Sequence, residues 1–267
     1  MAKVAINGFG RIGRLFLRQA IAKSNIDIVA VNDLGSAENL AYLLKYDTVY
    51  GRFAPSVSAG DGYLEVAGKR IAFLQIRELK DLPWGELGVD IVIEATGIFE
   101  KYEEAKGHLE SGAKRVVITA PAKDPDGADG RTVLVGVNED ELKAYVLSSN
   151  GSCTTNAASP IIQILSENPG IEKAVLNTVH GYTATQNIVD GPAKGKDFRR
   201  GRAAAQNITP STTGAALAVV RALPDLKDKF DGIAMRVPVP AGSVADITFI
   251  SKRKTTVEEV NEILSEA

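Results

Sequence analysis

Cys153 is the only cysteine in the 267-residue chain, and it lies among hydroxyl and amide side chains in the run SSNGSCTTNAAS. The nucleophilic form of cysteine is the thiolate, which the unpaired N–H groups at the start of a helix favour. We expect a helix from Cys153 to about Glu167, with the thiol in its first turn. A single cysteine is usually an inert core residue, but an apolar core seldom offers so many hydrogen-bonding neighbours. The pattern therefore predicts a catalytic nucleophile.

His180 is the candidate base for this thiol. It ends the strand-like run AVLNTVH and precedes Gly181, which places its ring at a strand end where both nitrogens can be used. Taken alone, such a histidine more often satisfies a buried hydrogen bond, and the presence of Cys153 is what favours a base. The other histidine, His108, lies in EEAKGHLESG, which we expect to be a solvated helix end and a poorer base.

Several polar residues after His180 suit a phosphorylated substrate. Arginine forks and helix N-termini bind phosphate oxygens strongly. The candidates are Thr183, the run GKDFRRGR with Arg199, Arg200 and Arg202, Thr213 and Gly214 ahead of a helix, and Arg236 in MRVP. A solvated loop or a subunit contact is the alternative for the arginine run.

The N-terminal run AINGFGRIGR carries glycines in GxGxxG spacing between an expected strand and an expected helix. In this context Gly8 permits the tight turn, Gly10 lets a pyrophosphate approach the backbone, and Gly13 allows close packing of strand and helix. Asp33 follows Gly13 by 20 positions and ends the second strand, where a carboxylate binds the adenosine ribose. Because a carboxylate repels a 2′-phosphate, the pattern predicts NAD rather than NADP. The alternative is a plain surface turn with Asp33 capping a loop.

Three further residues follow later strands, namely Thr96 and Gly97 in EATG and Thr119 in VVITAP. Ligands of open α/β sheets bind at the carboxyl ends of the strands, so we expect these residues at the same site. Individually they are equally typical of ordinary turns.

The first part of the chain alternates strand-like and helical segments. The strand-like runs are 3–7, 27–32, 89–95, 115–119, 132–137 and 145–149, and the helical runs include 11–24 and the more polar 101–112. This alternation predicts an α/β fold with a Rossmann-type, doubly wound parallel sheet over residues 1–150. Strands near 173–181, 232–240 and 244–251 have short or irregular connections, and they predict an α+β catalytic domain with a mixed or antiparallel sheet over residues 151–267.

Composition excludes several classes of protein. The formal net charge is only -2, which gives no global attraction to nucleic acid or to an anionic membrane, and no apolar run approaches the roughly 20 residues of a spanning helix. One cysteine excludes an internal disulfide, and the start MAKVAINGFG lacks the features of a signal peptide. We therefore expect a soluble cytoplasmic protein that binds neither nucleic acid nor membrane. With two histidines and one cysteine, we expect no metal site.

Seven motifs, taken in order, resemble the phosphorylating glyceraldehyde-3-phosphate dehydrogenase family. They are INGFGRIGR, VNDL, KYDTVYGRF, SCTTN, HGYTATQ, STTGAA and MRVPVP, and the similarity runs from residue 3 to the end. The resemblance implies NAD as cofactor, glyceraldehyde 3-phosphate and inorganic phosphate as substrates, and a homotetramer. It adds Arg11, Ile12 and Arg77 to the expected cofactor site.

The resemblance also implies a mechanism. Cys153 would attack the aldehyde, His180 would take the proton and stabilise the oxyanion, and hydride transfer to NAD would leave a thioester that phosphate converts into 1,3-bisphosphoglycerate. The implied contacts of the substrate phosphate are Thr183 and Arg236, with Arg199 nearby. The implied contacts of the inorganic phosphate are Ser152, Thr154, Thr213 and Gly214.

Members of the family continue beyond the helix that reaches Ala267, with a further strand and a long terminal helix. We therefore expect a truncated form of a complete enzyme, without the last part of the catalytic domain. Two alternatives stay open. One is a paralogue that oxidises erythrose 4-phosphate and hydrolyses the thioester, and the other is a non-catalytic NAD-binding or interaction protein.

Overall fold

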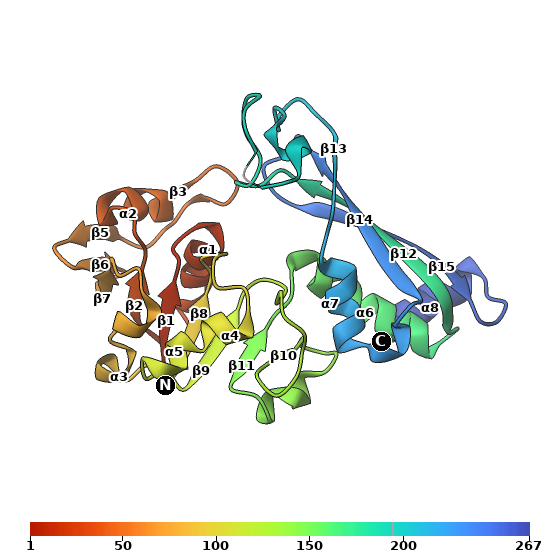
Figure 1. The fold of residues 1–267 in the computed structure, drawn as a ribbon, viewed down its shortest axis with the longest axis horizontal. Coiled ribbons are helices and arrows are strands. Elements are labelled where there is room, and N and C mark those ends of the chain that lie inside the picture. The colour runs from red at the N-terminus through yellow and green to blue at the C-terminus, as the bar shows by residue number, and fades with distance from the viewer. Residues whose placement is uncertain (194) are drawn as a thin grey trace. The chain divides into compact units, whose positions relative to one another are not determined.

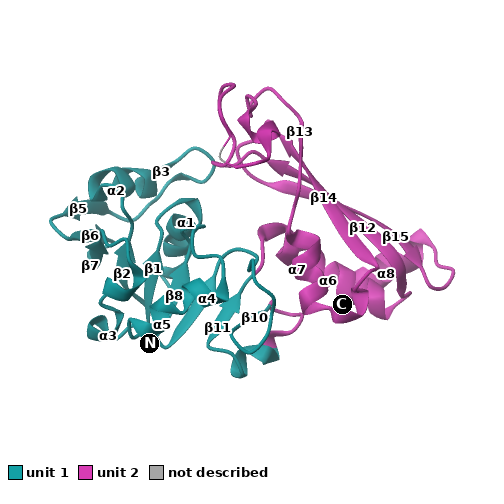
Figure 2. Cartoon of the chain, viewed as in Figure 1, with its two compact units in different colours: residues 1–133, 140–150 teal, residues 134–139, 151–267 magenta. Residues whose placement is uncertain are grey.

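The computed structural model describes residues 1–193 and 195–267, and the chain divides into two compact units. Unit 1 comprises residues 1–133 and 140–150, and unit 2 comprises residues 134–139 and 151–267 (Figure 2). Each unit has its own sheet and its own hydrophobic core.

Unit 1 contains a mixed sheet with the strand order β10-β11-β9-β8-β1-β2-β7-β6-β5 (Figure 1). Strands β1, β2, β7, β8, β9, β10 and β11 run parallel, and β5 and β6 add antiparallel strands at one edge. The strands are β1 (Ala2–Asn7), β2 (Ile26–Asn32), β5 (Val57–Gly60), β6 (Tyr63–Val66), β7 (Lys69–Leu74), β8 (Ile91–Glu94), β9 (Arg115–Ile118), β10 (Arg131–Thr132) and β11 (Leu147–Ser149), with a separate small hairpin of β3 (Tyr46–Asp47) and β4 (Gly51–Arg52). The helices are α1 (Arg11–Ala20), α2 (Ala37–Lys45), α3 (Trp84–Leu87), α4 (Tyr102–Ala105) and α5 (Gly107–Glu110), with a 3-10 turn at Leu79–Asp81 and another at Glu139–Lys143.

The parallel sheet of unit 1 is buried on both faces because alternate residues of its strands enter different cores. Along β1, Val4 and Ile6 join a core with α1 and α2, whereas Ala5 joins a second core with Trp84 and Tyr102. Side chains of a strand alternate between faces, so the two cores lie on opposite sides of the sheet. This doubly wound arrangement brings the carboxyl ends of β1, β2 and β8 to one edge.

Three details of the predicted unit 1 were wrong. The expected strand 132–137 ends at Thr132, because Gly136 adopts φ +75° and the Leu134 carbonyl accepts the N–H groups of a turn. The expected helix 101–112 is two short helices, α4 and α5, and its face at Tyr102, Ala105 and His108 is buried. The strands β3 to β7 were not predicted at all, although β7 lies beside β2 in the parallel part of the sheet.

Unit 2 contains a mixed sheet with the order β13-β14-β12-β15, in which β12 pairs parallel to β14 and antiparallel to β15. Helices α6, α7 and α8 pack on this sheet through Ile162, Leu176, Val219 and Phe230 (Figure 1). The elements are α6 (Cys153–Glu167), β12 (Ile171–Gly181), β13 (Thr209–Ser211), α7 (Ala215–Ala222), β14 (Phe230–Val237), β15 (Ser243–Ser251) and α8 (Val257–Glu266), with 3-10 turns at Phe198–Gly201 and Pro224–Leu226. The three predicted strands of this unit are therefore present.

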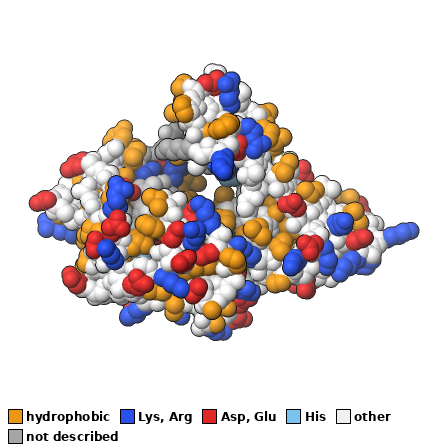
Figure 3. All heavy atoms as spheres, viewed as in Figure 1, with side chains coloured by type: hydrophobic (Ala, Val, Ile, Leu, Met, Phe, Trp, Pro, Cys, Tyr) orange, Lys and Arg blue, Asp and Glu red, His pale blue; other side chains and the backbone are white. Residues whose placement is uncertain are grey.

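The surface carries no obvious segregation of charge on the face drawn in Figure 3, where acidic and basic side chains lie intermixed. No helix among the described residues is long and apolar enough to cross a membrane. In the same residues, no group of three or more His, Cys, Asp and Glu side chains is arranged to hold a metal ion.

Candidate active site

The thiol of Cys153 is positioned by a capped helix start. Helix α6 begins at Cys153, as predicted, and the Ser152 side chain accepts a hydrogen bond from the Thr155 N–H at 3.0 Å. The Thr155 hydroxyl in turn accepts from the Ser152 N–H at 3.1 Å, which completes a capping box. Gly151 precedes the box with φ +63°, and a Cβ there would lie 2.9 Å from the Thr155 side chain. These contacts hold Cys153 at the positive end of the helix dipole.

The His180 ring lies beside this thiol. His180 is the penultimate residue of β12, and its Nε2 lies 3.3 Å from the Cys153 Sγ. The hydrogen bond from His180 lowers the pKa of the Cys153 thiol, although burial opposes the shift. The same bond raises the pKa of His180, against burial and the charge of Arg236. Both shifts favour a thiolate beside an imidazolium.

Arg236 of β14 lies opposite His180 in the parallel register of β12 and β14. The His180 Nδ1 is 2.7 Å from Nη1 of Arg236 and also 2.7 Å from the Gly181 carbonyl oxygen. A guanidinium only donates and a carbonyl only accepts, so Nδ1 satisfies one of them at a time. A neutral ring accepts from Arg236, whereas an imidazolium donates to Gly181. Moving Arg236 away from the ring therefore favours the charged form.

A second arginine extends the anion-binding cluster. Arg200 donates to the Thr185 hydroxyl at 3.0 Å and to the Ser211 hydroxyl at 3.1 Å, and the Thr185 and Thr183 hydroxyls lie 2.9 Å apart. The positive charge of Arg200 is close enough to help lower the pKa of Arg236, after the larger effect of burial. Two guanidinium groups and three hydroxyls thus form one donor-rich cluster beside His180.

The other residues predicted for phosphate lie as follows. Arg199 pairs with Asp197 at 2.7 Å and Arg202 with Asp190 at 2.9 Å. Arg200 also lies 3.5 Å from Asp197, but its Nη atoms reach the Thr185 and Ser211 hydroxyls, so it is the member of the run that joins the cluster. The Thr213 hydroxyl accepts from the Ala215 N–H at the start of α7, and the neighbouring Gly214 is exposed. Thr154 is buried, with its hydroxyl 3.4 Å from that of Thr178.

A cavity of about 330 Å³ lies at the carboxyl ends of β1, β2 and β8 in unit 1. Its walls include five residues that the sequence predicts for the cofactor: Gly8, Gly10, Asp33, Arg77 and Thr96. The other predicted residues, Arg11, Ile12, Gly13, Gly97 and Thr119, are not among its lining residues. Thr119 instead donates its hydroxyl to the Glu94 carbonyl at 2.9 Å, and Arg11 pairs with Asp47 at 3.0 Å.

The glycine turn at this cavity has the geometry that a pyrophosphate needs. A Cβ on Gly8, at φ +93°, would lie 2.6 Å from the Thr96 nitrogen, and a Cβ on Gly13 would collide with the Gly8 carbonyl oxygen. Above Gly10 no atom lies within 4 Å of the Cβ position, so the backbone at the start of α1 is open to a ligand. Asp33 accepts from the Phe9 N–H at 2.7 Å and from the Gly35 N–H at 2.8 Å, which fixes its carboxylate at the cavity wall. These observations fit a dinucleotide.

Sequence reasoning missed part of the cavity wall. The further lining residues are Asn7, Asn32, Leu34, Ile76, Ala95, Ile98 and Phe99. Asn7 and Asn32 are the last residues of two apolar strands that lead to the expected site. A position at the end of such a strand was the signal that identified Asp33, and it could have identified these two residues as well. Their amides point into the buried interior, which a local pattern does not reveal.

The predicted solvent exposure of His108 was wrong. Its side chain is fully buried rather than solvated, and it lies between Trp84 and Glu94. The polar residues of the segment occupy the other faces of α4 and α5, so the average polarity of the run concealed one inward face.

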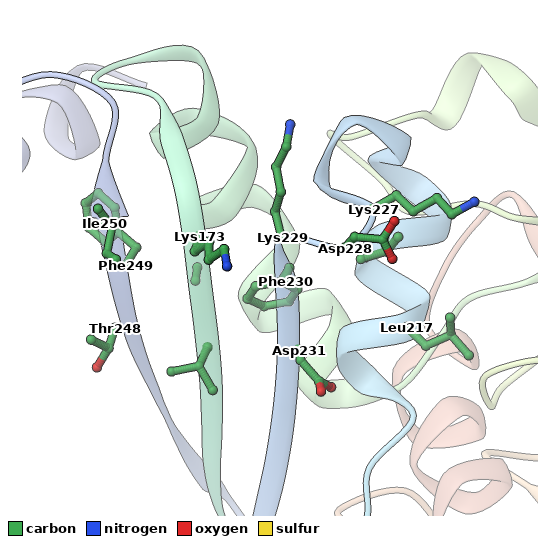
Figure 4. A pocket seen from close by; sticks show the side chains of 13 residues that line it. Lys173, Leu217, Lys227, Asp228, Lys229, Phe230, Asp231, Thr248, Phe249 and Ile250 are labelled. Atoms are coloured by element: carbon green, nitrogen blue, oxygen red, sulfur yellow. The ribbon is translucent and has the colours of Figure 1, made fainter.

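A groove of about 810 Å³ elsewhere in unit 2 contains none of the predicted site residues. The labelled side chains in Figure 4 come from β12, β14, β15, α7 and the loop before β14, and three of them are lysines. The residues that line this groove include neither a cysteine nor a histidine. The groove therefore offers no second pairing of a thiol with an imidazole like that of Cys153 and His180.

Comparisons with known proteins match both parts of the chain. A family model described as glyceraldehyde 3-phosphate dehydrogenase, NAD binding domain, matches residues 2–102, and one described as glyceraldehyde 3-phosphate dehydrogenase, C-terminal domain, matches residues 152–267. The chain is 50% identical to glyceraldehyde-3-phosphate dehydrogenase 1 of Trichormus variabilis, over 99% of this chain and 77% of the relative. It is 51% identical to the glyceraldehyde-3-phosphate dehydrogenases of Streptomyces coelicolor and Geobacillus stearothermophilus, over 99% of this chain and 78% of each relative.

Proposed function

The chain belongs to the glyceraldehyde 3-phosphate dehydrogenase family, and from that premise we propose that it oxidises D-glyceraldehyde 3-phosphate and phosphorylates the product to 1,3-bisphosphoglycerate. Membership confirms the predicted α/β fold with a Rossmann-type NAD-binding domain, and NAD as the cofactor. The observation that carries the proposed mechanism is the 3.3 Å contact of the Cys153 thiol with His180 at a helix start, beside Arg236.

The residues of the glycine turn and the cavity wall would hold the dinucleotide. Helix α1 has no side-chain cap, so the N–H groups at its start would bind the pyrophosphate, and Asp33 would offer its carboxylate to the ribose. When bound, NAD would supply the oxidant. It would accept the hydride that a hemithioacetal on Cys153 loses as it becomes a thioester. The pairing of Asp33 with two backbone N–H groups leaves one lone pair on each oxygen for ribose hydroxyls.

Cys153 is the proposed nucleophile. Its thiolate sulfur forms a bond to the aldehyde carbon, and the carbonyl oxygen takes up the electron pair of the broken C–O π bond. The Nε2–H of His180 donates its proton to that oxyanion, which gives the hemithioacetal hydroxyl, and the now neutral nitrogen takes this proton back when the hemithioacetal is oxidised. Inorganic phosphate then attacks the thioester carbon, the C–S bond breaks, and Cys153 leaves as the thiolate.

The donor-rich cluster beside His180 is the proposed site of the substrate phosphate. Arg236, Arg200 and Thr183 provide the charge and the hydrogen-bond donors. Since Arg236 competes with the proton on Nδ1 of His180, a phosphate that draws the guanidinium away would favour the imidazolium and hence the thiolate. Ser152, Thr154, Thr213 and Gly214 are the proposed contacts of inorganic phosphate. Arg199 remains a proposed neighbour of the substrate site.

Initial-rate measurements of NADH formation test the function. We expect turnover with glyceraldehyde 3-phosphate that requires phosphate, or arsenate in its place. Erythrose 4-phosphate as substrate, with hydrolysis and no phosphate dependence, would contradict the proposal in favour of the paralogue. NAD binding without turnover, with a titratable Cys153 thiol, would contradict it in favour of a binding protein.

We further propose that the protein is a cytoplasmic homotetramer. Light scattering of the purified protein tests the assembly, and cell fractionation tests the compartment. A single species of one chain's mass, 28.4 kDa, would contradict the tetramer.

A further inference from the structure

A buried chain of hydrogen bonds crosses unit 1 and ends at the cavity wall. His108 and Glu94 are both almost completely buried, and the His108 Nε2 lies 3.0 Å from the Glu94 Oε2. On the other side of the imidazole ring, the indole N–H of Trp84 lies 2.9 Å from Nδ1. The proposed catalytic mechanism uses none of these three side chains.

The donor and acceptor roles along this chain follow from chemistry. An indole nitrogen only donates, so Nδ1 of His108 accepts the hydrogen bond of Trp84 and carries no proton. The ring proton is then on Nε2, which donates to Glu94. Trp84 thus selects the one neutral tautomer that delivers a hydrogen bond to the carboxylate.

A second set of bonds reaches the same carboxylate from the strand ends. The Ile76 N–H donates to the Asn32 Oδ1 at 2.9 Å, and the Asn32 amide donates to the Asn7 Oδ1 at 2.7 Å. The Asn7 amide nitrogen is therefore left to donate to the Glu94 Oε2 at 2.6 Å. Backbone groups at one end and an indole at the other fix every orientation in the network.

The other oxygen of Glu94 acts on the cavity wall. Its Oε1 accepts from the Thr96 N–H at 2.8 Å and from the Thr96 hydroxyl, whose oxygen accepts from the Ile98 N–H at 3.0 Å. Thr96, Ile98 and Asn7 all line the cavity, and the missing Cβ of Gly8 leaves just enough space for the Thr96 backbone. The His108 ring also packs edge-on against Phe99, another wall residue, with ring centroids 6.5 Å apart.

We propose that His108 is a positioning residue of the dinucleotide cavity, which holds Glu94 so that its carboxylate fixes Thr96 and Asn7 in the shape that binds NAD. The inference rests on the proposed function only in taking this cavity as the NAD site. His108 itself touches neither cofactor nor substrate.

Calorimetric binding of NAD to matched variants tests the proposal. His108→Leu fills the site with a side chain of similar size and removes both hydrogen bonds, and we expect the Kd for NAD to rise about tenfold. His108→Gln can accept from Trp84 and donate to Glu94 with its amide, so its Kd should stay within about threefold of the wild-type value. Val116→Ala, in the same core but outside the network, is the control that lowers the melting temperature without raising Kd.

Steady-state kinetics and the lone tryptophan give independent readouts. We expect the KM for NAD to rise in His108→Leu while kcat changes by less than about twofold, since the residue shapes binding rather than the reacting groups. Trp84 is the only tryptophan of the chain, so its emission reports its own hydrogen bond. Loss of the acceptor in His108→Leu should shift the emission to shorter wavelength, and His108→Gln should keep the wild-type maximum.

A double-mutant cycle with Thr96→Val tests whether His108 acts through the wall. If it does, the increase in Kd caused by His108→Leu is much smaller when the Thr96 hydroxyl is already absent. Equal increases in the Kd for NAD with and without the Thr96 hydroxyl would overturn the proposal that His108 acts through Thr96.

The outcomes separate this inference from the function. Wild-type affinity for NAD in His108→Leu would overturn the inference and leave the function intact, whereas failure of the wild-type protein to bind NAD would refute the function itself. If His108→Leu does not fold, the comparison of His108→Gln with His108→Asn tests the inference instead. His108→Asn is one methylene too short to reach both partners and should bind NAD several-fold more weakly than His108→Gln, and equal affinities of the two would overturn the inference.

Discussion

Replacing His180 by Gln tests the electrostatic coupling that the geometry assigns to the thiol. The bond from His180 lowers the pKa of Cys153, and the thiol in turn raises the pKa of His180. Both shifts favour the ion pair of a thiolate and an imidazolium. Without the imidazole, the pKa of Cys153 rises, so the thiolate is formed only at higher pH.

The size of the effect follows from the distance. Unit charges 3.3 Å apart attract by about 1 kcal/mol in bulk water and about 5 kcal/mol at an effective dielectric constant of about 20. Cys153 is an exposed residue although burial still acts on its thiol, so solvent screening brings the value closer to the lower limit than to the upper one. We therefore expect alkylation by iodoacetamide at neutral pH to slow about tenfold in His180→Gln, since about 1.4 kcal/mol is a factor of ten.

The assay is the second-order rate of alkylation as a function of pH, followed by mass spectrometry. In the wild-type protein the rate should rise as the pH passes the lowered pKa of the thiol, and in His180→Gln the same rise should occur at higher pH. Glu167→Gln, at the far end of α6, is the control and should keep the wild-type profile. Superimposable profiles for wild type and His180→Gln would refute the proposed coupling.

Four further predictions concern the two units. Cys153→Ser should nearly abolish NADH formation yet leave NAD affinity within about twofold, and an active variant would contradict the thioester route. Asp33→Asn should lower the preference for NAD over NADP about tenfold in competition kinetics, because it removes the charge that repels a 2′-phosphate; an unchanged preference would remove Asp33 from the ribose site. Arg236→Leu should raise the KM for glyceraldehyde 3-phosphate far more than the KM for unphosphorylated glyceraldehyde, and equal increases would argue against a phosphate contact. Thr256→Ala should lower the free energy of unfolding by about 1 kcal/mol in urea titrations, because the Thr256 hydroxyl caps α8 at the Glu259 N–H; no change would show that the cap is dispensable.

Features set by neighbours in the chain could be predicted from the sequence. The glycine turn between β1 and α1 depends on which residues tolerate positive φ and close approach, and residue type reports both directly. The start of α6 at Cys153 follows from a capping side chain and a small-residue run, and His180 at the end of β12 follows from the length of an apolar strand. The N-cap of α8 is Thr256, although the preceding Thr255 offers the same hydroxyl, so residue type alone does not fix which of the two caps the helix.

Local strand propensity gave a wrong prediction for the segment 132–137, where the backbone turns. Residues 132–137 read as a strand, yet Gly136 reverses the chain and only Arg131 and Thr132 pair. The burial of His108 was missed for a related reason, since a helix face becomes visible only when its partner surface is known.

Only the tertiary structure decided which side chains meet. Cys153 and His180 are 27 positions apart, and Arg236 reaches the same ring because β14 lies parallel to β12 in one particular register. Within one basic run, both Arg199 and Arg200 pair with Asp197, but only Arg200 also reaches the Thr185 and Ser211 hydroxyls. The bond between Glu94 and His108 joins a strand end to a helix, with Trp84 fixing the ring proton. Residue types along the chain determine which chemistry is possible, whereas register and packing between distant segments determine which groups come close enough to perform it.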